Sequence, residues 1–286
     1  MGVDLLQYKT CNLNCVYCEL GKTICLEQDR NRFVRPERVL AEIRAKRNDD
    51  FDYLTFAGSG EPTLSIDLGE IIRSAKKIID VPVAVITNSV LLTDQQVRQE
   101  VALADVVLPS LDAATQKTFC VINRPPSGLM IKDIIEGLID FRKEFAGEIW
   151  LEVMLVRGIN DHEAELISKM ADSVQPDRIQ INTIVRKPAE LVMPLKEEDM
   201  LKMLEIFPEA EVIPDWDWTV PHEIKAEIIE ILTQKSCTLE ELVALLELQK
   251  TDVIKYLSIL ERDESLSRQL KDGKLCFHAS KKYAKN

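Results

Sequence analysis

The segment Cys11-Asn-Leu-Asn-Cys15-Val-Tyr-Cys18 places three thiols within eight residues, directly after an apolar run that predicts a β-strand. Thiolates bind iron–sulfur clusters, and a cube-shaped cluster has four irons to ligate. Three cysteines leave one iron open, and an open metal position distinguishes a catalytic site from a structural one. The alternative is a structural zinc loop, but such a loop normally needs a second pair of ligands, which Cys25 does not supply. We therefore predict Cys11, Cys15 and Cys18 as iron ligands.

Beyond this loop, short β-branched runs alternate with longer helical patterns as far as Thr183. This alternation predicts an α/β fold with a parallel sheet covered by helices, joined by right-handed crossovers. A complete eight-stranded barrel takes about 250 residues, and only about 210 precede the change of pattern, so we predict a partial (β/α)6 barrel of the TIM type. The predicted strands are Val3–Lys9, Tyr53–Ala57, Val81–Thr87, Asp105–Ser110, Ile149–Val156 and Arg178–Asn182. The predicted helices are Pro36–Lys46, Gly69–Ile79, Asp94–Val101, Ile131–Phe145, His162–Val174 and Glu197–Ile206.

The pattern breaks in residues 208–221, where the sequence IPDWDWTVP gathers prolines, aspartates and tryptophans. We predict a barrel domain in residues 1–207, and then a linker or barrel-closing segment in 208–221. Residues 222–286 show helical patterns at His222–Gln234, Thr238–Glu247 and Lys250–Arg262, followed by a hairpin across Leu266–His278. Three helices and a two-stranded wing predict a small winged-helix domain. Thr238 and Glu241 form a predicted capping box at the second helix.

The composition of the 286-residue chain is that of a globular protein, with 46% hydrophobic and 29% charged residues. No apolar run is long enough to cross a membrane, and the first residues lack the pattern of a signal peptide, so we expect a cytoplasmic protein. The net charge of −12 argues against a general affinity for nucleic acid. Seven cysteines, three of them clustered, are a poor disulfide framework and favour a metal site.

The segment Cys11–Cys18 resembles the CxxxCxxC motif of the radical S-adenosylmethionine (SAM) superfamily, including the aromatic residue before the last cysteine. The resemblance implies a [4Fe-4S] cluster whose open iron is chelated by the amino and carboxylate groups of SAM. It also implies that SAM is reductively cleaved to a 5′-deoxyadenosyl radical, with electrons from a flavodoxin or ferredoxin. By the same resemblance, Tyr17 packs near the adenine.

Further motifs follow the predicted strands. The turn Gly58-Ser59-Gly60-Glu61 resembles the GGE motif of the superfamily, which implies contacts to the SAM ammonium. Thr87-Asn88-Ser89 and Ser110-Leu111-Asp112 resemble positions that hold the ribose or carboxylate of SAM. The predicted cofactor-binding residues are Tyr17, Gly58, Ser59, Gly60, Glu61, Asn88, Ser110, Asp112, Asn123, Arg124 and Asn160.

Two alternatives stay open among the charged residues of these loops. Arg124 and Arg186 either clamp an anionic group through their planar guanidinium or pair with structural acids. Glu152 points either into the barrel or outward.

Across residues 4–190 the motifs most resemble short iron–sulfur oxidoreductases related to the wyosine-base synthases that act on transfer RNA. The chain departs from that group because it has no second cysteine cluster and carries its own predicted winged helix. The resemblance implies a radical SAM enzyme, and its unidentified substrate is an RNA base, a peptide or a small molecule. The locally basic wing and tail of the predicted winged helix suit a contact with an RNA, peptide or protein substrate. Alternatives are an activase of glycyl-radical enzymes and an iron–sulfur-sensing winged-helix transcription regulator.

Overall fold

The computed structural model describes residues 1–213, 220–246, 248, 253, 256–257, 260–261, 265–271 and 274–280. The chain divides into two compact units, Met1–Pro214 and Asp215–Asn286.

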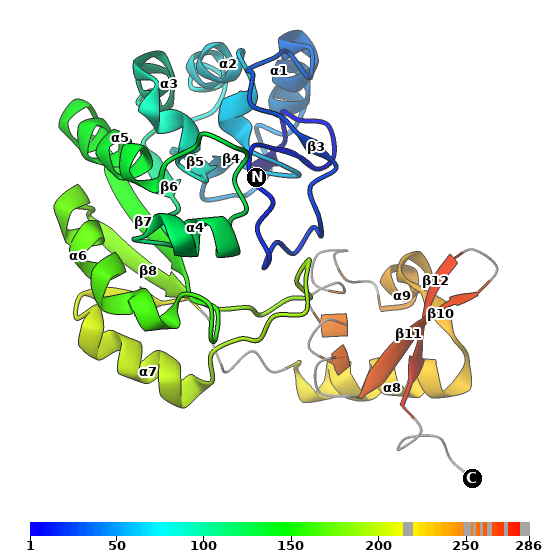
Figure 1. Cartoon of the computed structure of the whole chain (residues 1–286). Helices are drawn as coiled ribbons and strands as arrows, with labels where there is room; N and C mark the ends of the chain where they lie inside the picture. The colour runs from blue at the N-terminus through cyan, green and yellow to red at the C-terminus, as the bar shows by residue number, and fades with distance from the viewer. Residues whose placement is uncertain are drawn as a thin grey trace. The chain divides into compact units, whose positions relative to one another are not determined.

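The N-terminal unit is built on a parallel sheet (Figure 1). Among the described residues, seven strands follow the order β1-β4-β5-β6-β7-β8-β9, and every neighbouring pair is parallel. The strands are β1 (Gly2–Val3), β4 (Leu54–Phe56), β5 (Val83–Thr87), β6 (Val106–Pro109), β7 (Glu148–Met154), β8 (Arg178–Asn182) and β9 (Ala210–Val212). The predicted α/β partial barrel is confirmed.

Two strands differ from the prediction. β1 ends at Val3 rather than Lys9, because the Asp4 carboxylate accepts a hydrogen bond from the backbone N–H of Leu6 (3.0 Å) and turns the chain. β9 lies inside the segment 208–221 and pairs with β8, so the sheet has one strand more than the six predicted. Residues 214–219, with both tryptophans of that segment, lie outside the described residues.

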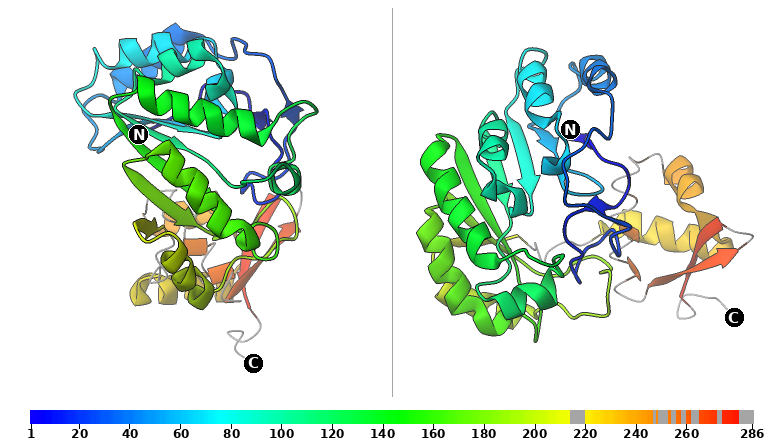
Figure 2. Two further views of the ribbon diagram at one scale, coloured as in Figure 1. Left: turned by 60° about the vertical axis from the view of Figure 1, so that its left-hand side comes forward. Right: turned by 45° about the horizontal axis from the view of Figure 1, so that its top comes forward.

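Helices cover the outer face of the sheet (Figures 1 and 2). They are α1 (Pro36–Ala45), α2 (Leu68–Ala75), α3 (Gln95–Val101), α5 (Ile131–Glu144), α6 (Ala164–Val174) and α7 (Glu197–Ile206), whereas α4 (Gln116–Ile122) lies apart from this outer layer. The sequence did not predict α4, since its seven residues are too short to show a helical period. Its first turn is fixed by Thr115, whose side chain accepts a hydrogen bond from the backbone N–H of Thr118.

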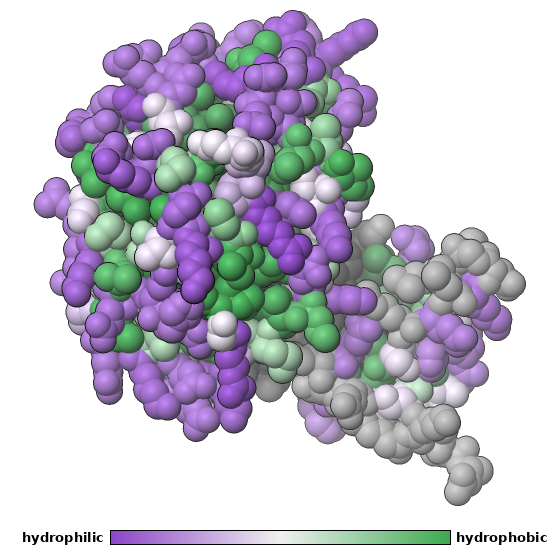
Figure 3. Space-filling model, viewed as in Figure 1, coloured by the Kyte–Doolittle hydropathy of each residue, from purple (hydrophilic) through white to green (hydrophobic). Residues whose placement is uncertain are grey.

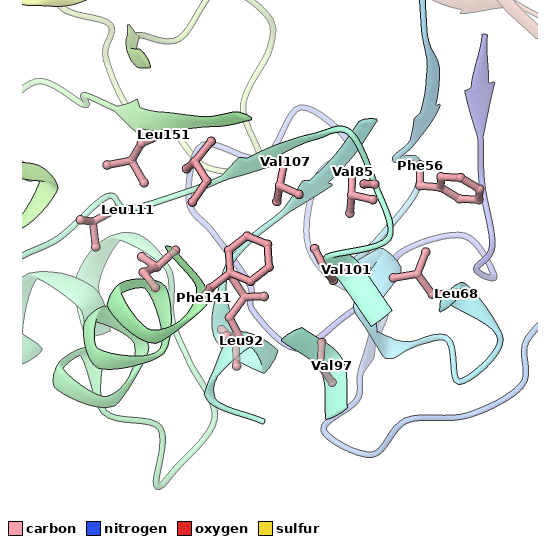
Figure 4. Close-up of a cluster of buried hydrophobic side chains, with 14 of the residues drawn as sticks. Phe56, Leu68, Val85, Leu92, Val97, Val101, Val107, Leu111, Phe141 and Leu151 are labelled. Carbon is pink, nitrogen blue, oxygen red and sulfur yellow. The ribbon is translucent and has the colours of Figure 1, made fainter. Parts of the chain in front are cut away.

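The core lies between the sheet and these helices. Alternate strand residues such as Phe56, Val85 and Leu151 point toward the helices, where they pack with Val101 and Phe141 (Figure 4). Burying each such side chain contributes about 1.5–3 kcal/mol. The surface over α1 and α2, at the top of the view, is largely hydrophilic (Figure 3). Because side chains alternate along a strand, residues of the other parity face the concave side of the sheet.

The C-terminal unit contains α8 (His222–Gln234), β10 (Cys237–Thr238), α9 (Leu239–Leu246), β11 (Leu266–Lys271) and β12 (Lys274–Ala279). Its strands form an antiparallel sheet in the order β10-β12-β11. The predicted hairpin is confirmed, with Lys271 opposite Lys274.

The capping box of this unit is also confirmed. Thr238 N–H donates to Glu241 Oε2 (2.8 Å), and Glu241 N–H donates to Thr238 Oγ1 (3.3 Å). Most of the predicted third helix, Lys250–Arg262, lies outside the described residues, so the winged helix stays a prediction. In the part of the chain that the structure describes, no helix has the length and apolar character needed to cross a bilayer.

Candidate active site

The cysteine loop is held at the carboxyl edge of the sheet by backbone contacts. A two-stranded parallel pair, β2 (Thr10–Cys11) and β3 (Cys25–Leu26), closes the loop at its base. The end of α4 fastens its middle, because Val16 N–H donates to the carbonyl of Ile122 (2.9 Å). Gly60 lies so close to the loop that an added Cβ would be 1.7 Å from the Thr10 carbonyl oxygen, and only glycine fits there.

Each of the three cysteine sulfurs receives a hydrogen bond. Cys11 Sγ accepts from the Leu13 backbone N–H (3.4 Å) and from Asn88 Nδ2 (3.6 Å). Asn123 Nδ2 donates to Cys15 Sγ (3.3 Å), and Lys9 Nζ donates to Cys18 Sγ (3.6 Å). Donors of this kind orient metal-bound thiolates and tune the reduction potential of iron–sulfur clusters.

Lys9 is a site residue that the sequence did not predict. It is only 3% exposed and has a φ of 64°, in the left-handed region that non-glycine residues rarely adopt. Its ammonium donates to the carbonyl of Gly21 and to Cys18 Sγ, and no carboxylate pairs with it in the described part of the chain. Because a buried cation is rarely left unpaired, this arrangement favours a negatively charged group beside the Lys9 ammonium.

The cysteine thiols are shielded from water. Burial raises the pKa of the Cys11 thiol to about 12 and also raises the pKa of Cys15. Bare thiols at Cys11 and Cys15 therefore stay protonated at neutral pH, and a bound metal would be needed to make them thiolates.

The cysteine side chains do not converge as a mononuclear site would. Among the described residues, no three His, Cys, Asp or Glu side chains are placed to hold a single metal ion. Three thiols on one loop without such convergence fit a cluster, whose ligands bind different irons.

Asn12 provides a second indication of a ligand beside Cys11. Its Oδ1 accepts a hydrogen bond from Asn88 Nδ2 (2.6 Å), whereas its buried Nδ2 has no hydrogen-bond partner among the residues that the structure describes. Such an orphaned donor is rare, and it requires an acceptor that the polypeptide does not supply. No sequence motif pointed to Asn12, because its significance depends on the fold.

The buried Glu61 carboxylate joins the ends of two strands. It accepts hydrogen bonds from Thr63 N–H (3.2 Å), Thr63 Oγ1 (2.6 Å), Thr87 Oγ1 (2.7 Å) and Asn88 N–H (2.7 Å). Burial raises its pKa, while these hydrogen bonds act in the opposite direction. A carboxylate offers about four acceptor positions, and in Glu61 these four hydrogen bonds fill them. One of the four comes from the Asn88 N–H, so Glu61 fixes the position of Asn88. Its predicted contact with SAM stays a prediction.

Asp112 also holds neighbouring segments in place through hydrogen bonds, on the other side of the cysteine loop. Its carboxylate accepts hydrogen bonds from Tyr17 Oη, from Asn123 Nδ2 (2.8 Å) and from the Met154 N–H (3.0 Å). Burial raises the pKa of Asp112. Asn160 donates to the carbonyls of Asp112 (2.8 Å) and Met154 (2.7 Å) and is fully buried. The predicted residues Tyr17, Asp112, Asn123 and Asn160 thus form one hydrogen-bonded network.

The remaining predicted residues lie at the same edge. Asp4 accepts hydrogen bonds from the N–H and Oγ of Ser59, and an added Cβ at Gly58 would be 2.4 Å from the Asp4 carboxyl carbon. Ser110 follows β6, beside Asn88.

The two arginines pair with acids, which is the second of the alternatives left open by the sequence. Arg124 Nη1 bonds Glu190 Oε1 (2.9 Å), and Arg186 bonds Glu19. Both arginines are substantially exposed.

The site can be compared with known proteins. Residues 6–171 match the model of the radical SAM superfamily, and the chain belongs to that superfamily. It therefore uses a [4Fe-4S] cluster and SAM, and it is an enzyme of this class.

Its relatives refine the assignment. The chain is 34% identical over 216 residues to the UPF0026 protein of Methanocaldococcus jannaschii, covering 73% of this chain and 67% of that protein. It is 32% identical over 253 residues to the UPF0026 protein of Helicobacter pylori strain J99, covering 86% and 79%. Within the superfamily, the chain belongs to this UPF0026 family. A protein of Brachyspira hyodysenteriae named GTPase Obg is 40% identical over 212 residues, covering 72% of this chain but only 31% of that protein.

Solved structures share the fold at low sequence identity. A radical SAM methyltransferase from Sphaerobacter thermophilus has a TM-score of 0.55 at 17% identity, covering 74% of this chain and 65% of that one. The FeFe-hydrogenase maturase HydG from Carboxydothermus hydrogenoformans has a TM-score of 0.53 at 14% identity, covering 74% and 52%. These likenesses show the fold alone.

Proposed function

We propose that this chain reductively cleaves SAM at a [4Fe-4S] cluster held by Cys11, Cys15 and Cys18, giving a 5′-deoxyadenosyl radical that abstracts hydrogen from a substrate. The observation that carries the proposal is the donor set around the three thiols. Each sulfur receives an N–H bond from a residue fixed by the sheet or by the loop itself. The buried Lys9 ammonium lies beside Cys18 Sγ, and Asn12 Nδ2 has no hydrogen-bond partner among the described residues.

In this proposal, SAM binds beside Asn88 and Ser110 at the ends of β5 and β6. Glu61 and Asp112 hold the surrounding loops in place through their hydrogen bonds. Gly60 allows the loop after β4 to approach the cysteine loop. The substrate is an RNA base, a peptide or a small molecule, and a flavodoxin or ferredoxin supplies electrons. We also propose that the C-terminal unit contacts the substrate.

The test uses the full chain, reconstituted with iron and sulfide without oxygen. We expect about four irons per chain, and formation of 5′-deoxyadenosine from SAM after reduction with dithionite. Replacing Cys11, Cys15 or Cys18 by Ala removes the cluster absorption and the product.

Cys25→Ala is the matched control, since Cys25 is exposed and lies only seven residues beyond Cys18. This variant keeps both the cluster and the product. A wild-type protein that holds one zinc instead of a cluster, or that forms no 5′-deoxyadenosine under reduction, contradicts the proposal.

A further inference from the structure

Glu152 faces the concave side of the sheet. On β7 it alternates with Leu151 and Val153, which are fully buried in the core clusters. Trp150, of the same parity as Glu152, contacts the ring of Tyr53 edge-on, with centroids 6.1 Å apart. Tyr53 directly precedes β4, three strands away in the sheet, so this contact crosses the concave side. The side chain of Glu152 therefore points into the barrel.

Glu152 belongs to a row of polar residues across that concave side. It lies opposite Ser110 of the neighbouring strand end and opposite Gln180 on β8. Neighbouring strands are about 4.8 Å apart, so these side chains adjoin one another. Asn88 begins the row beyond Ser110, whose N–H bonds the Thr87 carbonyl (2.9 Å). Since Asn88 Nδ2 also bonds Cys11 Sγ, the row runs from the cysteine loop into the barrel.

The three inner side chains of this row are unpaired. The Ser110 hydroxyl, the Glu152 carboxylate and the Gln180 amide make no side-chain hydrogen bond or ion pair with any residue that the structure describes. Gln180 is only 8% exposed. Among the described residues, the only buried side-chain N or O atom without a partner is Asn12 Nδ2, so the polar atoms of this row reach solvent and are open to a ligand.

The Glu152 carboxylate has no cationic partner among the residues that the structure describes. Burial, reinforced by the neighbouring Asp112, raises the pKa of Glu152 to about 7. Arg178 is the next charged residue along β8, but it pairs with Glu211 and lies over the ring of Trp150. No Lys or Arg side chain that the structure describes forms an ion pair with the Glu152 carboxylate.

We propose that Glu152 and Gln180 form the substrate subsite and bind a guanidinium or amidinium group of the substrate. A carboxylate accepts two parallel N–H bonds from such a planar cation, and the Gln180 amide oxygen accepts a further one. Trp150 and Tyr53 form the apolar floor of the subsite. This inference rests on the proposed function, because it places the substrate next to SAM at Asn88 and Ser110.

Binding can be measured without any activity through the fluorescence of Trp150. The other two tryptophans, Trp216 and Trp218, are replaced by Phe to leave Trp150 as the single reporter. We expect n-butylguanidinium to change its emission saturably, and the neutral isostere n-butylurea to bind at least about tenfold more weakly. An N-acetylated arginine peptide amide, titrated in parallel, distinguishes a peptide source of the guanidinium from a small molecule.

Two variants test the residues. We expect Glu152→Gln to weaken n-butylguanidinium binding at least about tenfold and Gln180→Leu about threefold. Glu165→Gln makes the same charge change on the exposed face of α6 and leaves binding unchanged. Equal binding of n-butylurea, or unchanged binding by Glu152→Gln, overturns the inference.

The same samples, assayed for reductive SAM cleavage, separate the two proposals. Formation of 5′-deoxyadenosine without guanidinium binding overturns the subsite alone. Guanidinium binding that depends on Glu152, in a reconstituted protein that forms no 5′-deoxyadenosine, supports the subsite and overturns the proposed function.

Discussion

Two sets of polar groups meet at the active site, and they differ in how they are paired. Glu61, Asp112 and Asn160 at the strand ends direct their side-chain atoms to polypeptide partners. Glu152 and Gln180, deeper on the concave face, have no such partners among the described residues. The polar atoms of the second set reach solvent, since among the described residues only Asn12 Nδ2 is a buried side-chain N or O atom without a partner.

The difference separates residues that build the site from residues that meet a ligand. A carboxylate with three or four internal donors fixes loops, and its loss disturbs every group bonded to it. An unpaired carboxylate costs the folded chain free energy until a ligand arrives. Four predictions test this distinction, beginning with the largest expected effect.

Asp112→Ala should cause the largest loss of stability. The substitution leaves Tyr17 Oη, Asn123 Nδ2 and the Met154 N–H without their acceptor. We expect the free energy of unfolding of the N-terminal unit to fall by about 3 kcal/mol, because each unsatisfied buried donor costs about 1–3 kcal/mol and loss of the buried carboxylate offsets part of this. Urea unfolding of the metal-free protein measures the effect. Ser110→Ala removes an unpaired hydroxyl and should change the free energy of unfolding by less than about 0.5 kcal/mol. Equal losses of stability in the Asp112 and Ser110 variants would contradict the distinction between paired and unpaired groups.

Glu152→Gln should reduce the loss of stability that the wild type shows as the pH rises from about 5 to about 8. The carboxyl group has an ordinary pKa of 4.5, and the folded chain raises it to about 7. The folded state thus binds its proton more tightly than the unfolded state, and wild-type stability falls as pH rises between these two values. From about pH 5 to about pH 8 this costs the wild type about 2 kcal/mol, a loss that Gln cannot show.

The measurement is urea unfolding of both proteins at the two pH values. The free energy of unfolding of the variant, relative to that of the wild type, should increase by about 2 kcal/mol from about pH 5 to about pH 8. The same pH dependence in both proteins would place Glu152 in water rather than inside the barrel.

The fold was accessible from sequence, and the cysteine motif could be recognised there, because both signals are local. The alternation of strands and helices is visible along the chain, and the motif Cys11–Cys18 lies within one loop. The pairing of the polar residues was not accessible, since it joins distant segments. Glu61 meets Asn88 27 residues away, and Tyr17 meets Asp112 95 residues away.

The same limit applies to single residues. Arg124 matched a pattern of anion binding, but its partner Glu190 lies 66 residues further along the chain. Lys9 carried no signal, because a lysine beside an apolar run is usually exposed and only the folded chain buries it. The sequence therefore predicted which residues gather at the site, but not which of them are free to bind.

Lys9→Met tests the donors around the sulfurs. Removal of a buried positive charge 3.6 Å from Cys18 Sγ disfavours the additional electron of the reduced cluster. We expect the midpoint potential to become more negative by roughly 50 mV, which corresponds to about 1 kcal/mol for one electron. A redox titration followed by electron paramagnetic resonance measures it. Lys22→Met is the control, because Lys22 is exposed and pairs with Glu190; equal shifts in both variants would assign the effect to general charge.

Arg124→Ala should have the smallest effect, and it decides between the two roles of this arginine. Arg124 has a φ of 46°, so Ala is the appropriate replacement because it bears the same backbone cost as Arg, whereas Gly would relieve it. The pair with Glu190 is exposed, and Lys22 bonds the same carboxylate oxygen (3.0 Å), so loss of Arg124 leaves Glu190 with a cationic partner. We expect an unchanged urea midpoint and a dissociation constant for SAM within about twofold of the wild type. An arginine that clamped the SAM carboxylate would instead lose at least about tenfold in affinity, and that result would move Arg124 from the paired residues to those that bind the ligand.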